Sequence, residues 1–371
     1  MYPKSAAEYV FAKNAFGNKM VAFVAGWMIV FVAVVSAAAV ALGFSGYLVS
    51  FVPGIHPIVA AIVLIAVLSG VNFIGIRESA WTNTTFTIIE IAGLAVIIGG
   101  AFALGLPTQT DYYQMPSAVT SPSLALVAIF GAAGLVFFAY FGFENLANVA
   151  EETRNARRTI PIALIASIVI TTAIYVLVAL SAVALAGWEA LSSSEAPLAL
   201  AAQRVLGGTG SFVLSAIALF ATTNTVLMML VASSRIMFGM AQDGALPKAL
   251  SSVHRSRKTP TLAVIATMAL GAAIVAVSSG SIEAVASVAV FGIFAVYILV
   301  NLSLIRLRYS QPRLERPFRS PVSLRGFPVL AGLGAATSAA MLTQFDLVTV
   351  VAGAVTACLA VLAFIIKERL H

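Results

Sequence analysis

Long runs without charge limit the fold of this sequence more than any other feature. No charged residue lies between Lys19 and Arg77, and the runs 112–143, 159–188 and 205–234 are also free of Asp, Glu, Lys and Arg. A helix needs about 20 apolar residues to cross a bilayer, so each run is long enough for at least one crossing. Because 61% of residues are hydrophobic and 9% charged, the chain is far more apolar than a soluble domain. The sequence predicts a polytopic membrane protein.

Turn residues and charges divide the apolar sequence into ten expected transmembrane helices. Their expected ranges are 20–47, 57–76, 84–104, 124–148, 160–185, 211–234, 261–279, 282–305, 328–344 and 347–366. Small residues recur within them, such as Gly99, Gly100, Gly131 and Gly134, and small residues let helices approach closely in lipid. We therefore predict an all-α bundle that forms a single transmembrane domain over residues 1–371.

The positions of the basic residues predict the orientation. When the ten helices are threaded through a membrane in order, every Lys and Arg except Arg204 falls on one side. Cytoplasmic loops carry this excess of basic residues. We therefore expect a multi-pass protein of the cell membrane with both termini in the cytoplasm, and we attribute the net charge of +7 to this bias rather than to nucleic-acid binding.

Several kinds of chemistry have no support in the sequence. His56, His254 and His371 are far apart and have no neighbouring Cys or paired acids, so no metal site is predicted. No Gly-rich phosphate loop with its Lys is present, and the Ser clusters lack a partner His. Cys358 stands alone in an apolar run, which excludes a disulfide within the chain and suggests a small buried residue. We expect neither a signal peptide, an enzyme, nor a cofactor.

Apart from Glu283 at the edge of a predicted helix, two carboxylates, Glu90 and Glu144, fall inside predicted helices, where ionisation costs on the order of 3 kcal/mol. Glu144 lies in an aromatic segment, 137–145, that also contains Gly142. A helix break at Gly142 would free backbone groups for a ligand, because irregular backbone at membrane depth is tolerated only beside protein or a cavity. The alternative is a glycine used for close packing and a Glu bonded to a neighbouring helix.

Other polar positions leave two interpretations open. Glu90 follows several Thr residues in the segment 82–87, so it is either part of a satisfied polar helix face or an ion-coupling group. Thr222 and Thr223 lie in a polar patch, 221–225, near the middle of an apolar helix. Their hydroxyls either coordinate a cation or substrate, or bond to the preceding turn of their own helix.

Three segments carry a resemblance to a known family. FAYFGFENLANVAEETRNARRTIP (138–161) resembles the sixth helix and following cytoplasmic loop of the amino acid/polyamine/organocation (APC) permeases. The segment 234–247 is similar to the loop after that family's eighth helix, and 2–17 resembles the loop between its second and third helices. The resemblance covers essentially the whole chain.

The resemblance implies an APC/LeuT-like inverted-repeat bundle. The ten expected helices then correspond to the family's third to twelfth, so the chain is expected to lack the first two. Residues 20–104 would be the remainder of the first repeat, 124–305 the second repeat, and 328–366 two accessory C-terminal helices. The family's broken first helix, which binds the substrate carboxylate and amine, would be absent.

The resemblance also implies roles for individual residues. Phe141, Gly142 and Phe143 would form an unwound segment whose carbonyls bind a substrate ammonium. Phe138 would close over the substrate, and Glu144 occupies the place of an acid tied to gating or proton sensing in some relatives.

Ion coupling is implied at three further residues. Glu90 lies near a position where certain proton-coupled relatives carry a Lys, and this departure leaves H+ and Na+ as candidate coupling ions. Thr222 and Thr223 lie near the hydroxyls that surround the cation in related sodium-coupled folds.

The sequence therefore predicts a secondary transporter of amino acids or related amines that works by alternating access, with ion coupling. Its expected partners are the substrate and the lipid bilayer, with no nucleic acid. The alternative is a truncated, non-transporting membrane protein that binds or assembles with partners. A membrane enzyme is disfavoured, because no polar groups converge on one site.

Overall fold

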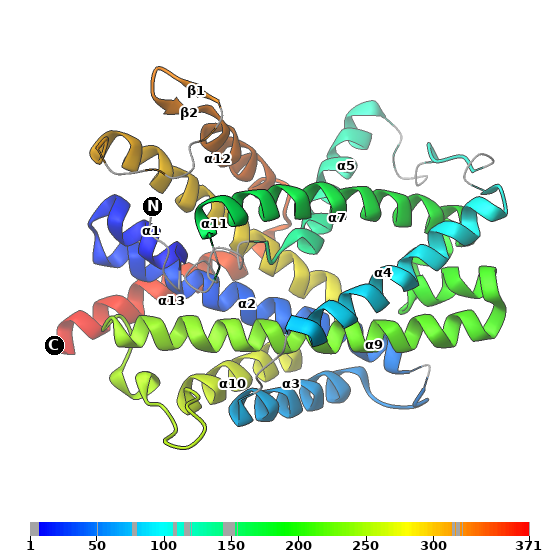
Figure 1. Ribbon diagram of the computed structural model, residues 1–371, viewed down its shortest axis with the longest axis horizontal. Coiled ribbons are helices and arrows are strands. Elements are labelled where there is room, and N and C mark those ends of the chain that lie inside the picture. The colour runs from blue at the N-terminus through cyan, green and yellow to red at the C-terminus, as the bar shows by residue number, and fades with distance from the viewer. Residues whose placement is uncertain are drawn as a thin grey trace.

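The computed structural model of the protein describes residues 7–49, 51–75, 80–106, 110–114, 121–143, 155–313 and 322–370, together with residues 119, 153, 316 and 320. Helices dominate these segments (Figure 1). They are α1 (Ala7–Phe16), α2 (Lys19–Leu48), α3 (Pro57–Ile74), α4 (Ala80–Ala103), α5 (Pro122–Val136), η2 (Phe137–Tyr140), α7 (Ala156–Ala186), α8 (Trp188–Ser192), α9 (Pro197–Gln242), η3 (Lys248–Ser251), α10 (Thr261–Val277), α11 (Ile282–Ser310), α12 (Val329–Leu342) and α13 (Leu347–Leu370). A small antiparallel hairpin joins β1 (Ser323–Leu324) to β2 (Phe327–Pro328).

Each of the ten predicted crossings coincides with one of these helices. Among the described residues, eight helices are long and apolar enough to cross a membrane. The remaining two, α10 and α12, have 17 and 14 residues, and at 1.5 Å per residue they are shorter than a bilayer core of about 30 Å. The prediction of an all-α membrane fold is confirmed.

Helix α2 is the centre of the bundle and packs against α1, α3, α9, α10, α11 and α13. Its middle is rich in Ala, and Val32, Val34 and Ala37 are fully buried. Glycine allows the close approach of α11 and α2, because Gly292 of α11 lies against the Val32 side chain of α2. Small residues are needed there because the backbones come close together.

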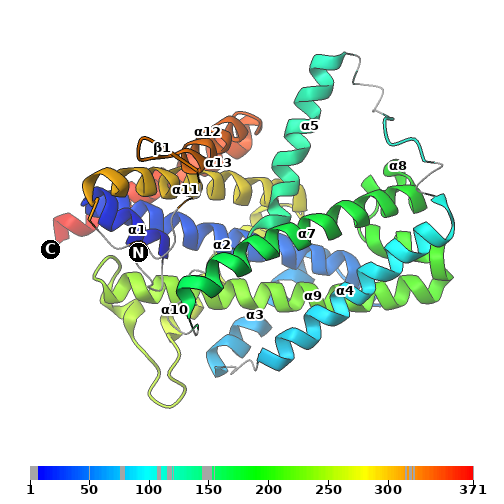
Figure 2. The same cartoon turned by 45° about the horizontal axis from the view of Figure 1, so that its top comes forward.

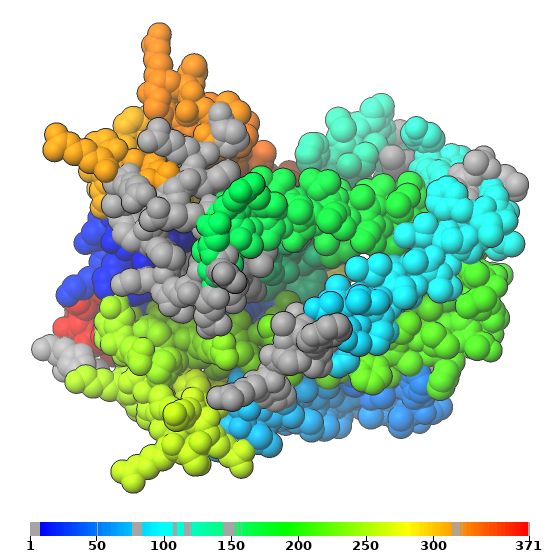
Figure 3. Space-filling view, viewed as in Figure 1, coloured from blue at the N-terminus to red at the C-terminus, as the bar shows by residue number. Residues whose placement is uncertain are grey.

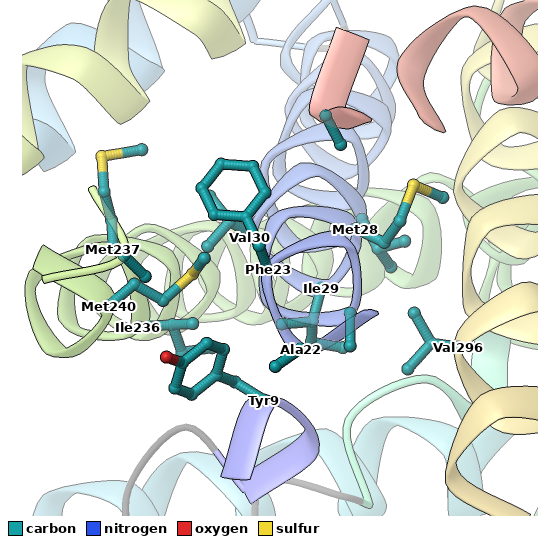
Figure 4. Close-up of a cluster of buried hydrophobic side chains, with 14 of the residues drawn as sticks. Tyr9, Ala22, Phe23, Met28, Ile29, Val30, Ile236, Met237, Met240 and Val296 are labelled. Atoms are coloured by element: carbon teal, nitrogen blue, oxygen red, sulfur yellow. The ribbon is translucent and has the colours of Figure 1, made fainter. Parts of the chain in front are cut away.

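The first large hydrophobic cluster joins α1 to this centre. Tyr9 of α1 is directed toward Ile236 and Met240 of α9, and Phe23 of α2 belongs to the same cluster (Figure 4). Helix α9 is far from α1 and α2 in the sequence, and the three helices bury these apolar side chains together. The sequence prediction contained no helix at 7–16, because this segment is too short to cross a membrane.

Polar contacts attach α1 and α13 to the end of α9. The Tyr9 hydroxyl and the Lys13 ammonium both donate to Asp243, the residue that follows α9, and the Lys13–Asp243 distance is 2.5 Å. Lys367 of α13 donates to the carbonyl of the next residue, Gly244. Helices α1 and α13 are therefore both fastened to the same end of α9.

Helices α4, α5 and α7 lie at the periphery of the bundle. Helix α5 stands apart from the rest in Figure 2, and α4 and α7 form much of the surface in Figure 3. Their apolar side chains are exposed; Ile165 and Val169 of α7, for example, are 60% and 62% exposed. In a membrane, lipid can cover such surfaces.

The prediction that Cys358 is buried is wrong, because Cys358 lies on the exposed face of α13. At such a position lipid can provide the apolar environment, and burial in protein is not required.

Two predicted helix boundaries are also corrected. Helix α9 has 46 residues instead of the predicted range 211–234, with a kink at Gly207, where φ is 65° and ψ is −153°. The predicted helix 124–148 stops early, because α5 and η2 end at Tyr140. Residues 144–148 of that prediction lie outside the described residues.

Candidate functional site

The chain leaves helical geometry where α5 approaches the interior of the bundle. After Val136 the helix tightens into the 3₁₀ turn η2, and Phe141 is extended with φ −67° and ψ 131°. The next residue, Gly142, has φ +123°, a conformation that side-chain-bearing residues rarely adopt. The predicted break at Gly142 is present, whereas the binding of a ligand there stays a prediction.

Aromatic contacts hold one side of the break against α11. The Phe137 ring lies 4.6 Å from Phe294 and 6.0 Å from Tyr297, measured between ring centroids. Phe138 is half-buried and packs where the two largest hydrophobic clusters meet, while Phe141 packs against the first of them. Two predicted substrate residues, Phe138 within the 3₁₀ turn and Phe141 just after it, thus rest on the core of the bundle.

Hydrogen bonds hold the same turn against α7. The Tyr140 hydroxyl donates to Thr172 Oγ1 at 3.1 Å, and the Tyr175 hydroxyl donates to the Ala139 carbonyl at 3.1 Å. The two tyrosine rings meet edge to face at 5.4 Å. Sequence reasoning missed Thr172 and Tyr175. Their only signal was two polar groups three residues apart, hence on one face of an otherwise apolar helix.

Glu90 is brought toward the break through Tyr175. The carboxylate is half-buried on α4, which packs against α7 and α9, and it interacts electrostatically with Tyr175. Tyr175 also bonds to the Ala139 carbonyl, so it interacts with both Glu90 and the backbone beside the break. The sequence contains no indication of this connection, because α4 and α7 are far apart along the chain.

The threonines of α9 bond within their own helix. Thr222 Oγ1 donates to the Ala218 carbonyl at 2.6 Å, and Thr223 Oγ1 donates to the Leu219 carbonyl at 2.6 Å. This is the second of the two arrangements left open by the sequence. Their part in cation binding stays a prediction. Glu144 lies outside the described residues, so its surroundings are not part of the site as described.

Metal binding has no structural candidate in the described segments, where no three His, Cys, Asp or Glu side chains come together. The arrangement around the break instead combines backbone carbonyls, aromatic rings and hydroxyls. Such groups can bind an organic cation and apolar side chains, because carbonyls accept from an ammonium and ring faces attract positive charge.

Comparison with known proteins connects this architecture to a family. Residues 1–367, nearly the whole chain, match the family described as amino acid permease. The chain belongs to this family. The permease is therefore a multi-pass membrane transporter and not an enzyme, and its APC resemblance is confirmed.

Individual relatives include transporters of several kinds. The permease is 28% identical to the branched-chain amino acid permease BcaP of Bacillus subtilis, over all of this chain and 80% of that protein. It is 30% identical to an uncharacterized transporter of Mycobacterium tuberculosis, over 85% of this chain and 69% of the relative. It is 25% identical to the methylthioribose transporter of Bacillus subtilis, over 86% of this chain and 70% of the relative.

Proposed function

We propose that this permease carries amino acids or related amines across the cell membrane by alternating access, with the break at Phe141–Gly142 as part of its substrate site. The observation that supports this proposal most directly is the break itself. It lies in an apolar helix next to the packed centre of the bundle, and irregular backbone is costly in a membrane unless it binds something or lines a cavity. Transporters commonly use such discontinuous helices at the substrate site.

The chemistry of the segment fits an α-amino acid. An ammonium group needs oxygen acceptors, and a broken helix directs backbone carbonyls away from their usual i+4 partners. Phe138, Phe141 and Phe143 place aromatic rings around the same turn, which suits both an ammonium and an apolar side chain. We therefore propose substrates with one ammonium group. The name of one relative, a branched-chain amino acid permease, makes branched-chain amino acids the first group to test.

We further propose that transport is ion-coupled and that Glu90 takes part in the coupling. A carboxylate within an apolar helix is costly and is best explained by a functional partner. Glu90 interacts electrostatically with Tyr175, and Tyr175 bonds to the backbone beside the break, so a change in the charge of Glu90 acts on the break through Tyr175. H+ is the ion expected to act through a single carboxylate, and Na+ acting through Thr222 and Thr223 is the other candidate.

Reconstitution into proteoliposomes tests these proposals. Labelled leucine is supplied under an imposed H+ gradient or an imposed Na+ gradient, and unlabelled amino acids, polyamines and methylthioribose compete. We expect leucine or another amino acid to accumulate, and we expect Glu90→Gln to abolish accumulation under the H+ gradient while leaving exchange of internal for external substrate. Glu144→Gln is expected to reduce uptake.

Two outcomes would contradict the proposal. If no amino acid or amine binds to the purified permease or enters the vesicles, the proposed substrate class is wrong. If substrate binds tightly but neither enters nor exchanges, the non-transporting alternative is correct. Normal gradient-driven accumulation by Glu90→Gln would remove Glu90 from the coupling mechanism.

We also propose that both ends of the chain lie in the cytoplasm, on the basis of the one-sided distribution of Lys and Arg. Fluorescent-protein and alkaline-phosphatase fusions to each end test this orientation. Fluorescence at both ends is expected, because the fluorescent protein matures in the cytoplasm. Phosphatase activity at either end would reverse the assignment.

A further inference from the structure

A carbonyl beside the break accepts a hydrogen bond from another helix. In a continuous α-helix the Ala139 carbonyl would accept from the amide of residue 143. The chain departs from helical geometry at Phe141 and Gly142, so the α5 helix does not extend to that amide. The Tyr175 hydroxyl donates to the Ala139 carbonyl at 3.1 Å. A side chain of α7 therefore donates to a carbonyl that a continuous helix would pair with the amide of residue 143.

A second bond runs in the opposite direction across the same contact. Tyr140, the residue after Ala139, donates its hydroxyl to Thr172, one turn before Tyr175 on α7. Each element thus donates once to the other, and the two rings contact edge to face at 5.4 Å. Such pairs of rings add to the attraction provided by the hydrogen bonds. The contact fixes both the distance and the rotation of η2 relative to α7.

A second helix, α11, also holds η2. Phe137 packs on Phe294 and Tyr297 of α11, and α11 packs directly on the central helix α2. The 3₁₀ turn is therefore in contact with both α7 and α11, and the Phe137 and Tyr140 rings that make these contacts lie 6.2 Å apart. The contacts with α7 use hydroxyl groups, and one of them, that of Tyr175, reaches the backbone at the break.

We propose that Tyr175 is a positioning residue that caps the broken helix and holds the segment Phe141–Phe143 in its substrate-binding conformation, while Tyr140 and Thr172 set its place against α7. This inference rests on the proposed function, because it assigns a role relative to the same site. The cap favours the broken conformation over a continuous helix, since in a continuous helix the Ala139 carbonyl already has an amide donor. A contact that differs between two conformations shifts the balance between them.

Substrate affinity is the property that this role controls. Tyr175→Phe removes the hydroxyl and keeps the ring, so the packing of α7 is retained. Loss of one such hydrogen bond is expected to raise the apparent KM for leucine, or for whichever amino acid the wild-type protein transports, by about threefold to tenfold. The maximal rate per folded transporter is expected to change little.

Tyr112→Phe is the matched control. The Tyr112 hydroxyl also donates to a carbonyl of α7, that of Leu180, at 3.3 Å, but it does not touch the break. Its removal is expected to leave KM unchanged. If Tyr112→Phe and Tyr175→Phe alter KM equally, or if Tyr175→Phe alters only the amount of folded protein, Tyr175 has a structural role alone and the proposal is wrong.

The Tyr140–Thr172 bond provides an independent test should Tyr175→Phe fail to fold. Tyr140→Phe and Thr172→Val are each expected to raise KM, and the double variant is expected to raise it no further, because both changes remove the same bond. Unchanged KM in all three proteins would overturn the proposal. Absence of both uptake and binding in the wild-type protein would instead reject the proposed function, so the two failures are distinguishable.

Discussion

Gly142→Ala probes the break with a minimal change. The backbone at Gly142 has φ +123°, and a Cβ added there would meet no heavy atom within 4 Å. The substitution therefore adds no steric contact with the part of the protein that the structure describes. Its effect comes from the backbone alone, because alanine disfavours this φ and favours a helix.

The magnitude follows from the cost of the conformation. Residues held in sparsely populated regions of φ and ψ cost about 1–3 kcal/mol each. If only the broken conformation binds substrate, this cost lowers the substrate affinity by about 5- to 150-fold. Alanine is also favoured over glycine in a helix by up to about 1 kcal/mol, and this preference acts in the same direction.

Equilibrium binding of a labelled amino acid to purified protein in detergent or nanodiscs measures the effect. Gly131→Ala is the control, because Gly131 lies in α5, its added Cβ would also meet nothing within 4 Å, and its φ is not positive. We expect Gly131→Ala to bind like the wild-type protein and to be equally or more stable. Equal affinity of the wild-type and Gly142→Ala proteins would refute the reasoning, as would an equal loss in both variants.

Two further predictions concern stability. Gly292→Ala would place a Cβ 2.6 Å from the Val32 side chain, and such overpacking is expected to lower the free energy of unfolding by about 1–3 kcal/mol. Gly43→Ala is the control, because its added Cβ would meet nothing within 4 Å. If Gly292→Ala unfolds at a temperature no lower than Gly43→Ala, the prediction is wrong. Burial, and then the hydrogen bond to Asp243, raise the pKa of Tyr9, so the folded protein keeps a proton that the unfolded chain releases above about pH 10. The contribution of Tyr9 to the free energy of unfolding is complete below pH 10 and is lost as the pH rises toward the folded pKa. Between pH 8 and 11, the free energy of unfolding should fall more steeply for the wild-type protein than for Tyr9→Phe. Equal slopes would refute this prediction.

The membrane fold was predictable because lipid leaves few choices. A long apolar segment in a bilayer must satisfy its backbone groups internally, which makes it a helix. For this reason the sequence predicted a helix at each of the ten positions, eight of which are long and apolar enough to cross a membrane among the described residues. It did not predict the ends of α9, which extends to Pro197 and Gln242, because packing rather than hydropathy determines where a helix ends outside the apolar region.

The site was predictable only in part. Gly142 among aromatic residues indicated a break, since glycine permits backbone conformations that other residues avoid. Tyr175 could not be found in the same way, because its importance depends on which face of α7 meets η2. For Thr222 and Thr223 the sequence allowed two hydrogen-bonding arrangements, and only coordinates could show that both hydroxyls donate within α9.

The attachment of α1 and α13 to the end of α9 has a practical consequence. Asp243 takes the bonds from Tyr9 and Lys13, and Gly244 takes the bond from Lys367. If α9 tilts during a transport cycle while these bonds persist, α1 and α13 must move with it. A pair of spectroscopic labels, one on α1 and one on the exposed loop before α10, would then report that tilt without any label in the membrane-embedded core.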